Sequence, residues 1–205
     1  MWFYYFCKFF AMIFYGIFYP HKIYGKENMP KDDNFILVCN HYAKIDILVV
    51  SALFKKRPYF LAKKQLMDGK FTGRLLRRYG LIPIDREKVD FNAMKECFAV
   101  LKRGDNLCIF PEGTRNREDD ELKELKGGAG MIALKAGVPI VPVMMLSRFM
   151  PFHKNYAIIG KPIDFGELKG QKANAEVIAD TEKIIREKML ECHSDLKRLA
   201  GGRKK

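Results

Sequence analysis

The sequence predicts an α/β fold: a mixed, largely parallel sheet flanked by helices, with a membrane-associated aromatic helix at the N-terminus. After residue 20, short apolar runs alternate with longer helical patterns, which is typical of a sheet built from strand–helix units. Gly, Pro, Asn or Asp bound most of the apolar runs. The first nineteen residues are almost entirely apolar or aromatic. We therefore expect a membrane-anchoring helix in residues 1–20 and one α/β domain in residues 21–205.

The N-terminal segment has the length of a membrane span but the composition of an interfacial helix. Of residues 1–19, 17 are apolar or aromatic, and a helix of that length would extend about 28 Å. Eleven of the nineteen are Trp, Tyr or Phe, which favour the headgroup region, and Lys8 is costly in a bilayer centre. The segment shows neither a basic leader nor a small-residue cleavage site, so we do not expect a removable signal peptide. We predict an interfacial or shallowly inserted helix ended by Pro20. The alternative is a helix buried against the protein, which needs cover on every side.

The remaining elements are predicted from the hydrophobic pattern and from the turn and capping residues that bound each segment. Apolar runs predict strands at residues 35–39, 59–62, 81–84, 107–110, 140–145 and 157–160. Helical spacing predicts helices at residues 45–54, 72–79, 91–102, 128–136 and 175–198. In parallel sheets, ligands bind beyond the carboxyl ends of the strands. Polar clusters follow three of the predicted strands, so we expect them to meet at one edge: His41, Asp85 with Arg86, and residues 112–115.

The charge and the cysteine pattern limit the classes of partner. The net charge of +13 favours anionic partners, such as nucleic acid, an anionic membrane surface or acidic substrates and carriers. Residues 55–88 hold eleven Lys or Arg against three acids, although a solvated helix face accounts for several of these. Base-reading motifs are not evident, so no nucleic-acid partner is expected. Five widely spaced cysteines without a CxxC, and scattered histidines, predict neither a disulfide framework nor a metal site.

His41 and Asp46 follow the first predicted strand with four residues between them. If His41 lies in the turn and Asp46 in the first helical turn, the carboxylate can orient the imidazole, which is then free to act as a general base. Equally, Asp46 or Asn40 can simply cap the next helix. Cys39 is a conceivable nucleophile, but its apolar run favours a buried structural thiol. This motif alone does not decide between a catalytic His41–Asp46 pair and a simple helix cap.

Two further segments suit anion binding. Arg86 directly follows a predicted strand in GLIPIDREK and can contact a phosphate through two donors. In FPEGTRNR, a glycine and an arginine after a strand suit an anion cradle, and Glu112 can orient Arg115 or accept from a substrate hydroxyl. As isolated segments, both are also compatible with ordinary turns or a solvated surface.

Taken together, these blocks resemble the glycerophospholipid acyltransferase family, whose bacterial members include lysophosphatidate acyltransferases. NHYAKID, GLIPIDR, FPEGTR and VPIVPV resemble the four family blocks in the family's order, and YGKENMP is similar to its entry segment, over about residues 20–165. The resemblance implies that His41 is the general base and Asp46 its orienting partner. It also implies substrate-binding residues: Arg86, Glu112, Gly113, Thr114 and Arg115 for the acceptor phosphate, and Pro142 near the acyl donor. Lys44 and Asn116 depart from the usual family residues, which leaves the subclass open.

The activity implied is transfer of a fatty acyl group from acyl-CoA or acyl carrier protein to the free hydroxyl of lysophosphatidate, giving phosphatidate. The family resemblance implies no metal and no redox cofactor, and it places the enzyme at the cytoplasmic face of the cell membrane as a peripheral or monotopic protein. Another lysophospholipid, glycerol 3-phosphate or a lipid-linked amine is the alternative acceptor. A non-catalytic basic protein that binds membranes or nucleic acid is the more remote alternative.

Overall fold

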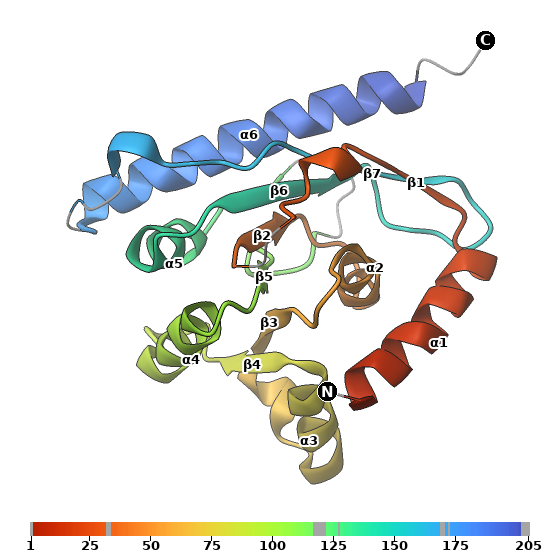
Figure 1. Ribbon diagram of the computed structural model, residues 1–205, viewed down its shortest axis with the longest axis horizontal. Helices are drawn as coiled ribbons and strands as arrows, with labels where there is room; N and C mark the ends of the chain where they lie inside the picture. Colours follow the sequence, from red (N-terminus) through yellow and green to blue (C-terminus); the bar gives the residue numbers. More distant parts are fainter. Residues whose placement is uncertain are drawn as a thin grey trace.

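The structure is a computed structural model that describes residues 2–31, 34–116, 122–126, 128–168, 171 and 173–201. Its described part contains a seven-stranded sheet in the order β1-β7-β6-β2-β5-β3-β4 (Figure 1). The strands are β1 (His21–Tyr24), β2 (Ile36–Cys39), β3 (Tyr59–Lys63), β4 (Leu81–Ile84), β5 (Leu107–Ile109), β6 (Ile140–Met145) and β7 (Asn155–Ile159). The α-helices are α1 (Trp2–Phe18), α2 (Asp46–Leu53), α3 (Lys70–Tyr79), α4 (Phe91–Lys102), α5 (Gly128–Ala136) and α6 (Ala175–Gly201).

The sheet is mixed but mostly parallel, as the sequence predicts. Every neighbouring pair is parallel except β6 with β7, which is antiparallel. The strands β6, β2, β5, β3 and β4 therefore share one direction, and their carboxyl ends lie along the same edge. Since β7 and β1 run the opposite way, their first residues lie at this edge too.

Alternation along the strands divides the core into two layers. Ile36 and Val38 of β2 face a cluster formed with α4, α5 and α6, whereas Leu37 and Cys39 face the side of α1, α2 and α3. Figure 1 shows α4 and α5 on one side of the sheet and α1 and α2 on the other. All of β2 is inaccessible to solvent, with each residue 0% exposed. A strand covered on both faces reads as a continuous apolar run, which is the pattern of residues 35–39.

Most element boundaries match the sequence pattern closely. The helices α4 and α5 have the predicted ends, and α4 begins where the Asp90 carboxylate accepts hydrogen bonds from Asn92 N and Ala93 N. The helix α3 ends at Gly80, whose φ of 111° suits a glycine. The exception is β1, which the sequence analysis did not predict. Its four residues are polar or only half-buried, so they carry little strand pattern.

The N-terminal helix has two different faces. Tyr4 and Tyr15 are buried in the core cluster, the Tyr4 ring lies 5.2 Å from that of Tyr79, and Lys8 Nζ donates to the Phe54 carbonyl. The opposite face exposes nine large side chains: Trp2, Tyr5, Phe6, Phe9, Phe10, Met12, Ile13, Phe14 and Ile17. The helix therefore packs on the domain and still presents a broad apolar surface. Within the described residues, no helix combines the length and the apolar character needed to cross a membrane.

Candidate active site

The predicted polar clusters meet at the carboxyl edge of the sheet. His41 follows β2, Glu112 and Gly113 follow β5, and Arg86 follows β4. The backbone N–H of His41 donates to Glu112 Oε1 at 2.9 Å, and Arg86 Nη1 donates to the Gly113 carbonyl. The parallel direction of the strands thus brings together three segments that are distant in the chain, which confirms this expectation of the sequence analysis.

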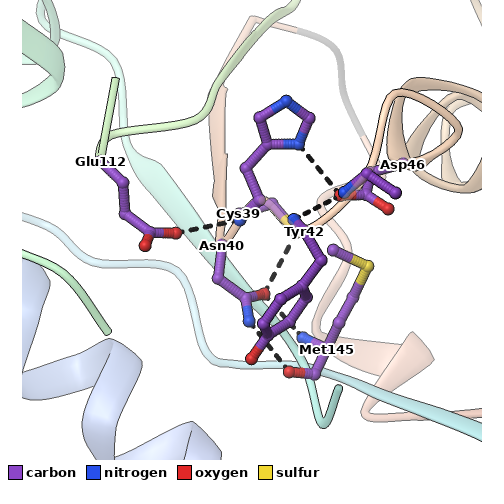
Figure 2. A network of polar contacts seen from close by, with 8 residues as sticks. Cys39, Asn40, Tyr42, Asp46, Glu112 and Met145 are labelled. Carbon is purple, nitrogen blue, oxygen red and sulfur yellow. Dashed lines mark hydrogen bonds and ion pairs between the residues drawn. The ribbon is translucent and has the colours of Figure 1, made fainter. Parts of the chain in front are cut away.

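His41 and Asp46 are in direct contact across the turn between β2 and α2. His41 Nδ1 lies 2.9 Å from Asp46 Oδ2, and Asp46 is 0% exposed. The same oxygen accepts from Tyr42 N at 2.7 Å and Ala43 N at 2.8 Å (Figure 2). The carboxylate therefore binds the turn that precedes α2 and does not cap the N–H groups of that helix, so the plain capping interpretation is wrong. The turn and the His–Asp contact are one structural unit.

This contact determines how the imidazole of His41 is presented. An ionised Asp46 accepts from Nδ1–H, which leaves the lone pair on Nε2 available. Among the described residues, Nε2 has no hydrogen-bond partner. The Phe110 ring stacks on the imidazole with centroids 4.1 Å apart, and the His41 side chain keeps 13% of its surface exposed. The ring is thus held on one side by a carboxylate and on one face by an aromatic ring, with one nitrogen free to accept a proton.

Glu112 holds the backbone of the site and does not face an open cavity. It is 1% exposed, and its second oxygen accepts from Lys123 N at 3.3 Å. Asn116 N donates to the His41 carbonyl at 2.6 Å, so the loop after β5 binds His41 at both backbone polar groups. Burial raises the pKa of Glu112, although its backbone donors and His41 partly offset this. The geometry favours a positioning role over the predicted contacts with Arg115 or a substrate hydroxyl.

The two arginines of the predicted anion site affect each other electrostatically. Burial, and then the positive charge of Arg115, lower the pKa of Arg86 below its usual value. Gly113 has a φ of 65°, so the loop between them turns at a residue that adopts this conformation without strain. Thr114 beside them is exposed. Two guanidinium groups that repel each other are better accommodated with an anion nearby.

Pro142 lies apart from this cluster. It is in the middle of β6 opposite Val38, and it lines a separate cavity with Gly160 and Cys192 below α6. Its carbonyl accepts from Gly160 N, at the point where the pairing of β6 with β7 ends. The missing N–H of a proline is tolerated at such a position.

Cys39, the last residue of β2, and Asn40, which follows it, are both buried. Cys39 is 0% exposed, and burial raises the pKa of its thiol well above the usual value. Asn40 donates to the Met145 carbonyl at 2.9 Å and accepts from Met145 N at 2.8 Å, which joins β2 to β6 beside His41 (Figure 2). The sequence analysis missed this role of Asn40; the only signal for it was a polar amide directly after a buried strand. Among the described residues, no group of three or more His, Cys, Asp or Glu is arranged to hold a metal ion.

Fold and site together define a class of protein: a helix-flanked, mostly parallel sheet with an oriented imidazole and an anion-binding loop at its carboxyl edge. The chain belongs to the Acyltransferase family, whose model matches residues 21–146. This result confirms the resemblance drawn from the four sequence blocks.

Individual relatives agree with this assignment. The chain is 31% identical over 175 residues to the 1-acyl-sn-glycerol-3-phosphate acyltransferase of Bacillus subtilis strain 168, covering 81% of this chain and 86% of that protein. It is 36% identical over 155 residues to the enzyme of the same name from Streptococcus pneumoniae R6, covering 72% of this chain but 56% of that protein. The crystal structure of the 1-acyl-sn-glycerophosphate (LPA) acyltransferase PlsC from Thermotoga maritima matches with a TM-score of 0.69 and 28% identity, covering 90% of this chain and 77% of that one.

Proposed function

We propose that the protein is a 1-acylglycerol-3-phosphate O-acyltransferase, which moves a fatty acyl group from a thioester to the free hydroxyl of lysophosphatidate. The observation that carries this proposal is the contact between His41 and a fully buried Asp46 beside the two arginines. The names of the relatives support lysophosphatidate as the acceptor. The donor is acyl-CoA or acyl carrier protein.

The reaction is a direct transfer with His41 as general base. Nε2 takes the proton of the acceptor hydroxyl while that oxygen attacks the thioester carbonyl. The tetrahedral intermediate then collapses, the carbon–sulfur bond breaks, and the imidazolium returns its proton to the leaving thiolate. Asp46 holds Nδ1–H and stabilises the imidazolium between these steps. A buried Cys39 whose pKa is raised does not supply a thiolate, so the proposal needs no acyl-enzyme.

The acceptor phosphate is bound by Arg86 and Arg115. Burial, and then repulsion from Arg115, lower the pKa of Arg86, and an anion bound by both guanidinium groups offsets that repulsion. Thr114, exposed in the same loop, supplies a hydroxyl to the same group. Glu112 and Gly113 set the backbone of this loop through their hydrogen bonds to His41 and Arg86.

The enzyme docks on the cytoplasmic face of the membrane as a peripheral or monotopic protein. The exposed apolar face of α1 supports this proposal, because its Trp, Tyr and Phe side chains suit the headgroup boundary. The neighbouring helix α3 adds exposed Phe71 and Leu75 together with exposed Arg74 and Arg78. Apolar and basic side chains on adjoining helices match an anionic lipid surface, where the acceptor resides.

The test is a thiol-release assay with purified protein, lysophosphatidate and an acyl thioester. We expect turnover, with glycerol 3-phosphate and other lysophospholipids as weaker acceptors. His41→Ala should lower kcat by about 10²–10⁴-fold, because it removes the general base. Cys39→Ser should retain nearly full activity, since the thiol is buried. Full activity of His41→Ala contradicts the mechanism, and complete loss in a folded Cys39→Ser variant favours a covalent route.

A further inference from the structure

A basic cavity at the same sheet edge is lined by residues of the turn that follows His41. It has a volume of about 900 Å³ and is lined by Tyr19, Lys44, Arg115, Ser147, Arg148 and Met150, among others. Lys44 comes from the turn between His41 and Asp46, whereas Ser147 and Arg148 follow the end of β6. The cavity therefore combines the β2–α2 turn and Arg115 of the loop after β5 with the segment after β6, and the acceptor site does not use this last segment.

The cations around this cavity are not neutralised by any acidic group that the structure describes. Within the described residues, Lys44, Arg115 and Arg148 form no ion pair. Lys44 and Arg148 are exposed, and Arg115 is half-buried. Like charges gathered around one concave surface attract an anionic ligand. Tyr19 and Met150 add apolar wall, so the cavity suits an anion attached to a less polar chain.

The strand order places the Arg148 end of this cavity and the Arg86 end of the acceptor site on opposite sides of β2, and Arg115 lies between these two ends. In the sheet, β2 lies between β6 and β5. Arg148 follows β6 on one side, and the Arg86–Arg115 pair follows β4 and β5 on the other. A direct transfer needs both substrates at His41 at the same time, and both carry phosphate. With lysophosphatidate on the β5 side, the β6 side remains for the donor.

We propose that Lys44 and Arg148 bind the phosphate of the acyl donor's phosphopantetheine arm, the anionic group that CoA and acyl carrier protein share. Ser147 contributes its hydroxyl, Arg115 borders both anion sites, and the apolar wall takes the arm between the phosphate and the thioester. This assignment rests on the proposed function, because it takes a thioester donor as given.

The experiment compares three donors: acyl-CoA, acyl carrier protein loaded with the same acyl group, and acyl-pantetheine, which lacks the phosphate. In Lys44→Gln and Arg148→Gln, we expect kcat/KM for the first two donors to fall by about tenfold or more, because a charge-assisted hydrogen bond is lost. The kcat/KM for acyl-pantetheine and the KM for lysophosphatidate should not change. The matched control is Lys154→Gln, an exposed lysine on the same β6–β7 connection that does not line this cavity.

Each contrary result overturns the assignment in a distinct way. An equal fall with acyl-pantetheine means that the substitutions disturb the site without contacting a phosphate. A rise in the KM for lysophosphatidate, with the donors unaffected, assigns the cavity to the acceptor headgroup. If only acyl-CoA is affected, the cavity binds the nucleotide end of CoA and not the shared arm. No change with any donor shows that the cavity has no role in donor binding.

A binding measurement separates this inference from the proposed function. Titration of the full-length protein with CoA, without acceptor, should give weaker binding in Lys44→Gln and Arg148→Gln than in wild type or Lys154→Gln. If lysophosphatidate is not acylated but CoA binding still depends on Lys44 and Arg148, the acceptor assignment fails and the inference stands. If lysophosphatidate is acylated and CoA binding is unaffected by both substitutions, the inference fails and the proposed function stands.

Discussion

At the residue scale, two buried carboxylates hold His41 from different directions. Asp46 binds the imidazole and the turn that follows it, whereas Glu112 binds the His41 backbone from the loop after β5 (Figure 2). Asp46 sets the tautomer of the ring, and Glu112 sets the position of the strand end that carries it. Both carboxylates are almost inaccessible to solvent, so their value lies in geometry rather than in contact with substrate.

Glu112→Gln tests this division of roles through its pH dependence. Below the usual pKa of 4.5, folded and unfolded chains both hold the proton. Because burial raises the pKa of Glu112 in the folded protein, the unfolded chain ionises first as the pH increases, which favours unfolding. The wild type therefore loses stability through this window, and the glutamine variant does not. The melting temperature of Glu112→Gln relative to wild type should increase as the pH rises above the ordinary pKa of 4.5.

Activity distinguishes Glu112 from a half-buried carboxylate elsewhere. Glu182 also has a pKa raised by burial and accepts from Gly130 N at 2.9 Å, far from the site. Glu182→Gln should show the same direction of pH-dependent stability with unchanged kcat. Glu112→Gln places an amide donor against one of two backbone N–H groups, so its kcat should fall by about tenfold or more. Equal kcat values for the two variants would contradict the positioning role.

At the element scale, α1 packs on the domain through one face and exposes the face that we propose docks on the membrane. Tyr4 and Tyr15 anchor it to the core, and Trp2, Phe9 and Ile17 on the other face are 76%, 61% and 64% exposed. Removing residues 1–19 would therefore uncover the core as well as abolish the exposed face, because the cluster beside α2 and α3 includes Tyr4 and Tyr15. Substitution of the exposed face alone is the cleaner experiment.

We expect Phe6→Ser, Phe9→Ser and Phe10→Ser combined to weaken vesicle binding by well over tenfold, since each buried aromatic side chain contributes about 1–3 kcal/mol. The melting temperature should stay close to that of wild type, because the three rings are exposed. Vesicle sedimentation measures binding. The control carries Leu190→Ser and Leu199→Ser, two exposed apolar side chains of α6. Unchanged binding of the triple variant with a soluble, folded protein would refute docking through α1.

At the scale of the whole molecule, part of the positive charge lies near the proposed membrane-facing surface. The net charge is +13, and α3 alone exposes Lys70, Arg74, Arg77 and Arg78 next to α1. Charge attracts the protein to anionic lipid and is screened by salt, whereas apolar insertion is not. The two contributions can therefore be separated.

Binding to vesicles that contain anionic phospholipid should fall steeply as ionic strength rises, and binding to zwitterionic vesicles should be weaker and nearly independent of salt. Arg74→Gln combined with Arg78→Gln should reduce the salt dependence without changing kcat on a water-soluble, short-chain acceptor. Lys95→Gln with Lys102→Gln in α4, on the other side of the sheet, removes the same charge as a control. An identical salt dependence in both double variants would exclude α3 from the docking surface.

The local pattern of the chain was sufficient for the fold class, for the ends of α4 and α5, and for the residues that gather at the sheet edge. Apolar spacing, capping residues and turn residues act over a few positions, so they can be read along the sequence. The strand β1 was not predicted because its residues are exposed or half-buried and it pairs only with β7, at the edge of the sheet.

Contacts between distant segments could not be predicted from the local sequence pattern. Whether Asp46 reaches His41 or caps a helix depends on the path of the turn, and the anchoring of Glu112 by His41 N and Lys123 N depends on which strand lies beside β2. The half-buried state of α1 depends on the surface that α2 and α3 leave open to Tyr4 and Tyr15. Residue types state which interactions are chemically possible, whereas packing of the whole chain selects the partners, because most buried polar groups find a hydrogen-bond partner only in three dimensions.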